Sequence, residues 1–157
     1  MIRKNVLSML VTNDSGKFLD FATLTYEVNG KTATFVVTGL PAGRSAWVME
    51  TGRMTVSGSP KFELVGCVTS YRDSVIAESS RVNITAKGNM LTAKNTSDKT
   101  LEDVFVYYRC LHTDGNFLGG VTYRVDFGTL APGESMEVLA GHYGDTARIV
   151  RIGWKGQ

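Results

Sequence analysis

The two halves of this chain nearly repeat each other, and this repeat constrains the fold more than any other feature of the sequence. Asn, Ser, Lys, Leu and Tyr recur at identical spacing in the segments Asn13–Tyr26 and Asn95–Tyr108. Farther along, Leu40–Ser45 is echoed by Leu130–Ser135, after eight extra residues in the second copy near His112–Gly119. Two matching motifs in the same order indicate an internal duplication, with the extra residues in a hairpin loop.

Apolar and polar residues alternate in short runs in both copies, which is typical of strands with one buried face. The expected inward positions are Phe35, Val37, Trp47 and Met49 in the first copy and Val121, Tyr123, Val125 and Phe127 in the second. In a further strand we expect Val104, Val106 and Tyr108 on one face and Phe105, Tyr107 and Arg109 on the other. Each copy therefore has the pattern of a β-sheet protein.

Turn residues separate these runs at short intervals. Asn29-Gly30 predicts a tight hairpin between Thr23–Val28 and Thr32–Val37, and Asp114-Gly115 predicts another. After the two proline-containing turns we expect a positive φ at Gly43 and Gly133. We expect Asn13 and Asn95 to bond nearby backbone and to accept left-handed geometry, while Leu19, Leu40, Leu101 and Leu130 fill the ends of the core.

Six or seven short strands per copy predict an all-β protein of two tandem immunoglobulin-like antiparallel β-sandwich modules. The first module is expected over residues 1–72 and the second over residues 80–157, with a short linker at 73–79. Because Val75 and Ile76 in this linker are apolar, we expect the modules to be in contact.

Composition excludes several classes of function for a chain of 157 residues. The net charge is +2 and the basic residues are scattered, so we expect no nucleic-acid partner. No apolar run reaches the ~18 residues of a membrane helix, so we expect no membrane span. The first residues are too few and too polar for a signal peptide, which leaves a cytoplasmic location open. Two thiols, Cys67 and Cys110, permit one disulfide, but two buried free thiols are the simpler expectation.

The second copy resembles the FxLYD-type immunoglobulin-like modules of bacterial surface proteins and lipoproteins, among them modules of Gram-positive gut bacteria. The resemblance rests on Asn95–Val104, the aromatic strand that follows, Asp114-Gly115 and Leu130–Ser135. It covers about Arg81–Trp154 and, more faintly, Asn5–Val68, without a full Phe-x-Leu-Tyr-Asp signature. It implies an extracellular or cell-surface module that is not an enzyme.

The residues themselves also predict no catalytic or metal centre, and hence no cofactor. His112 and His142 have hydroxyl or carboxylate neighbours, but a nucleophile motif on a strand-to-helix turn is missing. Glu102 and Asp103 point to opposite faces of a strand. Asp114–Asn116 lacks the spaced acidic ligands of a calcium loop, so a hairpin turn is the better interpretation.

The aromatic residues suggest binding to a protein or glycan partner. We expect Phe105 and Tyr107 to lie on a second apolar face of their strand, and the hairpin near His112, Asn116 and Phe117 to be presented at the surface. These five residues are the candidate partner contacts of a structural or interaction module. The alternatives are a carbohydrate-binding module that uses exposed aromatic rings, and an open sheet edge that accepts a strand from another chain.

Overall fold

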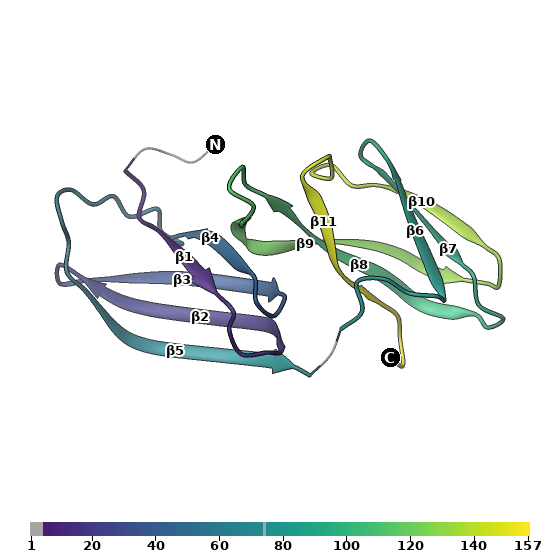
Figure 1. Ribbon diagram of the computed structural model, residues 1–157, viewed down its shortest axis with the longest axis horizontal. Coiled ribbons are helices and arrows are strands. Elements are labelled where there is room, and N and C mark those ends of the chain that lie inside the picture. Colours follow the sequence, from purple (N-terminus) through teal and green to yellow (C-terminus); the bar gives the residue numbers. More distant parts are fainter. Residues whose placement is uncertain (1–4, 74) are drawn as a thin grey trace. The chain divides into compact units, whose positions relative to one another are not determined.

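The computed structural model describes residues 5–73 and 75–157, and every regular element within them is a strand (Figure 1). The strands are β1 Ser8–Thr12, β2 Phe18–Val28, β3 Lys31–Leu40, β4 Ser45–Met49, β5 Phe62–Arg72, β6 Val82–Lys87, β7 Met90–Asn95, β8 Leu101–Leu111, β9 Phe117–Leu130, β10 Ser135–Leu139 and β11 Ala147–Gly153. The all-β prediction is confirmed. The first four residues of the expected first module, and Ser74 of the expected linker, lie outside the described residues.

Residue contacts divide the chain into two compact units. Unit 1 contains the described residues up to Asp73 together with His112–Val121, and unit 2 contains Val75–Leu111 and Thr122–Gln157. The hairpin before β9 and the first residues of β9 thus belong to unit 1, although they lie in the second half of the sequence. Ile76, which lies within the expected linker, pairs with Ile152 of unit 2.

Unit 1 contains two sheets. In the first, β2 lies between β3 and β5 and pairs antiparallel with both. In the second, β1 pairs antiparallel with β4, and β4 pairs in parallel with the start of β9 through Ala46 and Phe117. The hairpin turn between β2 and β3 forms as predicted, with Asn29 and Gly30 both at positive φ.

Unit 2 has equivalent strand pairings but a different third strand in its second sheet, since β6 lies beside β7 whereas in unit 1 the start of β9 lies beside β4. In one sheet β8 lies between β9 and β11, and in the other β7 lies between β10 and β6. Its core gathers residues from both sheets, including Leu91, Val106, Phe127 and Ile152. The predicted inward face of β8 is confirmed, since Val104, Val106 and Tyr108 are buried. Buried side chains between paired layers give a sandwich-like arrangement.

The prediction that Trp47 and Met49 of β4 point inward is wrong. Ala46 and Val48 are buried, whereas Met49 is 41% exposed and Trp47 is half-buried. Every residue from Ala46 to Met49 is apolar, so alternation alone does not fix the phase of this strand. Val121 is likewise exposed rather than inward. Phe35, Val37, Val125 and Phe127 are buried as expected.

One buried asparagine forms the same corner in each unit. Asn13 Nδ2 donates to the carbonyls of Lys17 and Leu40, both at 2.8 Å. Asn95 Nδ2 donates to those of Lys99 at 2.7 Å and Leu130 at 2.9 Å. In both corners Oδ1 accepts from the hydroxyl of the serine two residues later, at 2.7 Å. The expected bonds to nearby backbone are confirmed, but neither asparagine has the positive φ of the left-handed region.

Gly43 and Gly133 complete the two corners with the predicted positive φ of 70° and 78°. Their N–H groups donate to the carbonyls of Asn13 and Asn95. The four expected end-filling leucines are also buried, which confirms the prediction for Leu19, Leu40, Leu101 and Leu130.

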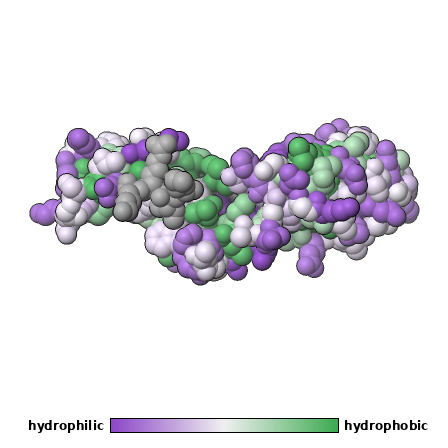
Figure 2. Space-filling view, turned by 90° about the horizontal axis from the view of Figure 1, so that it is seen from above, coloured by the Kyte–Doolittle hydropathy of each residue, from purple (hydrophilic) through white to green (hydrophobic). Residues whose placement is uncertain are grey.

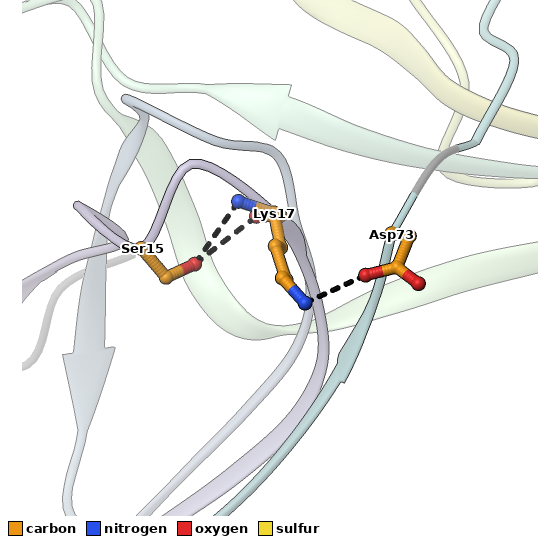
Figure 3. A network of polar contacts seen from close by, with 3 residues as sticks. All are labelled: Ser15, Lys17 and Asp73. Atoms are coloured by element: carbon orange, nitrogen blue, oxygen red, sulfur yellow. Dashed lines mark hydrogen bonds and ion pairs between the residues drawn. The ribbon is translucent and has the colours of Figure 1, made fainter.

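A polar network lies at one end of the β2–β5 pair in unit 1, where the start of β2 meets the end of β5 (Figure 3). The Oγ of Ser15 accepts from the backbone N–H of Lys17 at 3.2 Å, and Lys17 Nζ lies 2.6 Å from Asp73 Oδ1. Lys17 comes just before β2, and Asp73 just after β5. Because both side chains are exposed, this ion pair adds little stability.

Glu50 is a buried carboxylate that organises the segment after β4. Its oxygens accept from the backbone N–H of Met54 at 2.8 Å and of Thr34 at 3.3 Å. Burial by itself raises the pKa of the Glu50 carboxyl, but the N–H groups of Met54, Gly52 and Thr34 outweigh it and hold the pKa below its usual value. Unit 2 has Ala140 at the corresponding position, so this capping is special to unit 1.

We expect unit 1 to lose stability in acid through Glu50. Because the folded-state pKa is depressed, the ionised carboxylate stabilises unit 1 above its unfolded pKa of about 4.3, and this contribution disappears as pH falls through the folded value. Glu50→Gln should cost about 1–2 kcal/mol at neutral pH and flatten the pH dependence. Urea unfolding followed by Trp47 fluorescence in a Trp154→Phe background, between neutral and acidic pH, measures both, and an unchanged pH profile in the variant would contradict the assignment.

Candidate interaction surfaces

The hairpin expected to face a partner is held on β4 within unit 1. Trp47 Nε1 donates to Asp114 Oδ2 at 2.7 Å, and an Arg44 guanidinium nitrogen donates to the carbonyl of Gly115 at 3.3 Å. The Arg44 guanidinium also lies 5.0 Å from the centre of the Phe117 ring. These bonds fix the hairpin to the strand that carries Trp47.

Asp114 is the acceptor at the centre of this contact. The hydrogen bond from Trp47, followed by that from the backbone N–H of Asn116, holds the pKa of the Asp114 carboxyl well below its usual value. His112 Nδ1 lies 3.1 Å from the other carboxylate oxygen. The carboxylate is therefore a hydrogen-bond anchor of the hairpin.

Three of the candidate partner contacts lie in this hairpin. His112 and Asn116 are half-buried, and the backbone of each pairs with the other across the turn. Phe117 is only 3% exposed, so its ring contributes to the interior of unit 1. Of these three residues, His112 and Asn116 therefore keep exposed surface, whereas Phe117 has almost none.

The other two candidates, Phe105 and Tyr107, lie together on the outer face of β8 in unit 2. Their ring centres are 5.2 Å apart. The Arg124 guanidinium lies 4.3 Å from the centre of the Phe105 ring, and that of Arg151 lies 5.2 Å from it. Both aromatic rings are half-buried, because arginine side chains cover them.

This cluster fits closely over the neighbouring strand. Phe105 is paired across the sheet with Gly153, where a Cβ atom would overlap the Phe105 ring. Arg124 also contacts Asp126 at 2.5 Å and Tyr107 Oη at 3.2 Å. The outer face of β8 thus presents guanidinium groups, with the flat faces of the rings turned toward them.

The two histidines occupy different units. His142 lies in unit 2, with its ring 4.8 Å from that of Tyr123, which stacks on Tyr108 at 5.1 Å. Burial raises the pKa of the neighbouring Cys110 thiol, which opposes formation of a reactive thiolate. Residues 5–73 and 75–157 contain no group of three His, Cys, Asp or Glu side chains placed to hold a metal ion.

Both cysteines are free thiols, and Cys67 is exposed rather than buried as expected. Cys110 is half-buried, and its thiol lies 3.5 Å from the carbonyl of His142. The expectation of two buried free thiols is therefore wrong for Cys67.

Unit 2 contains a cleft of about 680 Å³ beside β6 and β11. Val82 and Ile84 of β6 line it together with Ile149 and Ile152 of β11, and Tyr143 and Arg148 lie at the same cleft. Residues of β6 and β11 therefore border the same cleft.

Strand β5, at the edge of its sheet in unit 1, exposes more large apolar side chains than any other described strand, and the sequence pattern did not single it out. Its large apolar side chains are 44–63% exposed, namely Phe62, Leu64, Val65, Val68 and Tyr71. Cys67 on the same strand is exposed as well. Long exposed apolar edge strands are rare because they pair with other chains.

Apolar side chains are also visible on another side of unit 1. Leu10 of β1 and Met49 of β4 are 42% and 41% exposed. The view from above shows apolar residues (green) at the surface of this unit among polar ones (Figure 2). Unit 1 therefore exposes apolar side chains on β1 and β4 as well as on β5.

Comparison of the chain with models of protein families, with curated proteins and with solved structures found no match. Among the residues that the structure describes, no helix has the length and apolar character needed to cross a bilayer.

Proposed function

We propose that this chain is a non-enzymatic interaction protein whose unit 1 binds an extended segment of a protein partner through β5. In this proposal the two units are tandem immunoglobulin-like modules of a bacterial surface or secreted protein, as the FxLYD-type resemblance implies. The observation that carries the proposed function is the exposed apolar side chains of β5 on an edge strand.

The chemistry of β5 favours a polypeptide over a small ligand. An edge strand offers backbone N–H and C=O groups that only another extended chain can satisfy in series. The exposed side chains on this strand include Leu64, Val68 and Tyr71, and burying them on a partner would remove unfavourable contact with water.

The equivalent asparagine corners support the tandem arrangement. The side chains of Asn13 and Asn95 each donate to two backbone carbonyls. One carbonyl belongs to the residue four positions later, and the other lies at the end of the third strand of the same copy. Two hydrogen bonds that recur in this way in the second unit are a geometric counterpart of the sequence repeat.

A peptide display library panned against the full chain tests the function. We expect wild-type protein to enrich extended apolar peptides, and the double variant Leu64→Lys/Val68→Lys to retain about a hundredfold fewer of them. Leu139→Lys, at an exposed apolar site in β10 of unit 2, is the matched control and should behave as wild type. Failure to enrich any peptide, or equal enrichment on the double variant, would overturn the proposal.

Carbohydrate binding through Phe105 and Tyr107 is the alternative, and the clustering of the two rings on one outer face favours it. The covering Arg124 and Arg151 oppose it, because a sugar ring stacks on an open aromatic face. A glycan array that gives a signal abolished by Phe105→Ala and Tyr107→Ala, with no peptide enrichment, would establish this alternative instead.

A further inference from the structure

The two units have equivalent strand pairings, so unit 2 indicates what belongs against the exposed strand of unit 1. The corner asparagines make β1 the counterpart of β7, and the sheet orders β3-β2-β5 and β9-β8-β11 make β5 the counterpart of β11. The first strand of each copy pairs antiparallel with the fourth, as β1 with β4 and β7 with β10.

Unit 2 covers β11 with the segment that includes β6. Val82 of β6 is 1% exposed, and β6 pairs antiparallel with β7 on the side away from β10. Just before β6, the carbonyl of Ile76 accepts from the N–H of Ile152 at 2.7 Å. This single segment completes one sheet and covers the edge strand of the other.

Unit 1 has no such strand among its described residues. β1 is the last strand of its sheet, and no strand within residues 5–73 or 75–157 pairs with its outer edge. Before β1, Val6 forms a bridge with Thr55. The open edge is therefore β1 itself, Ser8–Thr12.

The register shows that the exposed residues of β5 occupy positions that unit 2 covers. Cys67 pairs with Leu24, as Ile152 pairs with the corresponding Val106. Ile152 is only 3% exposed, whereas Cys67 is exposed.

The next inward position of β5 shows the same difference. Leu64 pairs with Tyr26, as Ile149 pairs with Tyr108. Leu64 is 53% exposed, whereas Ile149 packs against the core of unit 2. The inner face of β5 is thus apolar and open where the inner face of β11 is covered.

We propose that unit 1 is completed by a β-strand from a separate polypeptide, which pairs antiparallel with β1 and lays aliphatic side chains over Leu64 and Cys67. This inference rests on the proposed function, in that the partner covers apolar side chains of β5, and it places the backbone of the partner segment on the edge of β1. Unit 2 supplies the chemistry of the occupant, because in β6 the apolar Val82 and Ile84 alternate with the polar Asn83 and Thr85. The partner segment is extended, with aliphatic residues at alternate positions and polar residues between them.

A synthetic peptide that copies Ser79–Lys87 is the direct probe, added to the full chain. We expect saturable binding that slows amide exchange in Ser8–Thr12 and alkylation of Cys67 by about tenfold each. A peptide carrying Asn in place of both Val82 and Ile84 is the control and should give neither effect. Leu139→Lys should keep the response, and Leu64→Lys should lose it.

A fusion makes the test independent of weak affinity. The same strand joined ahead of the chain by a Gly/Ser linker should raise the Tm of unit 1, reported by Trp47 in a Trp154→Phe background, by about 5 °C, and the Asn-substituted strand should not. No binding at about 1 mM peptide together with no Tm increase would overturn the inference.

The outcomes separate this inference from the proposed function. Library peptides that require Leu64 and Val68 but leave the amides of β1 unprotected would overturn strand completion and leave partner binding through β5 intact. A dimer in which β5 pairs with β5 of a second copy would give the same result, with protection on β5 alone. The absence of any β5-dependent peptide would instead remove the proposed function.

Discussion

Asn95→Ala is expected to destabilise unit 2 by about 3 kcal/mol, and Asn13→Ala to do the same to unit 1. Each asparagine is buried, at 0% and 3% exposed, and donates to a buried carbonyl at the end of the third strand of its copy. Alanine removes both donors and the acceptor for the following serine. The carbonyl of Leu130 or Leu40 is then left without its amide partner in a place that water does not reach.

The chain carries one tryptophan in each unit, which makes the two effects separable. Trp47 lies in unit 1 and Trp154 packs against the core of unit 2. Urea unfolding of Asn95→Ala in a Trp47→Phe background follows unit 2, and Asn13→Ala in a Trp154→Phe background follows unit 1. Each substitution should lower the midpoint of its own unit.

Asn83→Ala is the matched control, since Asn83 is exposed on β6 and its loss should change the free energy of unfolding by less than about 0.5 kcal/mol. A loss below about 1 kcal/mol at Asn13 or Asn95 would contradict the structural role given to the corners. It would also weaken the physical case for a duplicated unit.

Local chemistry made part of this fold predictable. Asn29-Gly30 specifies a tight hairpin because both residues accept positive φ, and it forms where expected. The positive φ of Gly43 and Gly133 was predictable for the same reason. The long-range bonds from Asn13 to Leu40 and from Asn95 to Leu130 were not predictable, because they depend on strands that meet only in the folded unit.

Strand phase is easiest to predict where polar residues alternate with apolar ones. In β9, Val125 and Phe127 lie on either side of the polar Asp126, and both are buried as expected. β4 is apolar from Ala46 to Met49, so its pattern does not show which of these residues point inward. The repeat held the missing information, since Val48 matches Val138, and Val48 is the buried residue.

The candidate site was less predictable than the fold because it depends on tertiary contacts. A surface hairpin is the ordinary expectation for an Asp-Gly loop, but Trp47 binds Asp114 and fixes the loop to β4. Arg109 was expected on the same face as Phe105 and Tyr107, opposite the inward face of β8, and it is fully buried, where burial lowers the pKa of its guanidinium to about 10. The openness of β5 follows from which strands cover it, and alternation within β5 does not contain that information.

Gly120→Ala is the second substitution expected to have a large effect, at about 3 kcal/mol on unit 1. Gly120 lies in the part of β9 that belongs to unit 1. A Cβ atom there would overlap the carbonyl oxygen of Val36 and lie 3.0 Å from Val48 Cγ1. Because the first of these neighbours is backbone, a rotamer change cannot relieve the clash, and the hairpin would have to move away from β3 and β4.

The displacement has its own spectroscopic signature. If the hairpin moves, Asp114 no longer accepts from Trp47, and the indole becomes more exposed to water, so Trp47 emission in a Trp154→Phe background should shift to longer wavelength before unfolding begins. Gly141→Ala is the control, since a Cβ atom at Gly141 meets nothing within 4 Å. Unchanged emission and stability in Gly120→Ala would mean that the hairpin does not depend on this close approach. Loss of stability with unchanged emission would place the strain elsewhere in β9 and leave the Trp47–Asp114 contact intact.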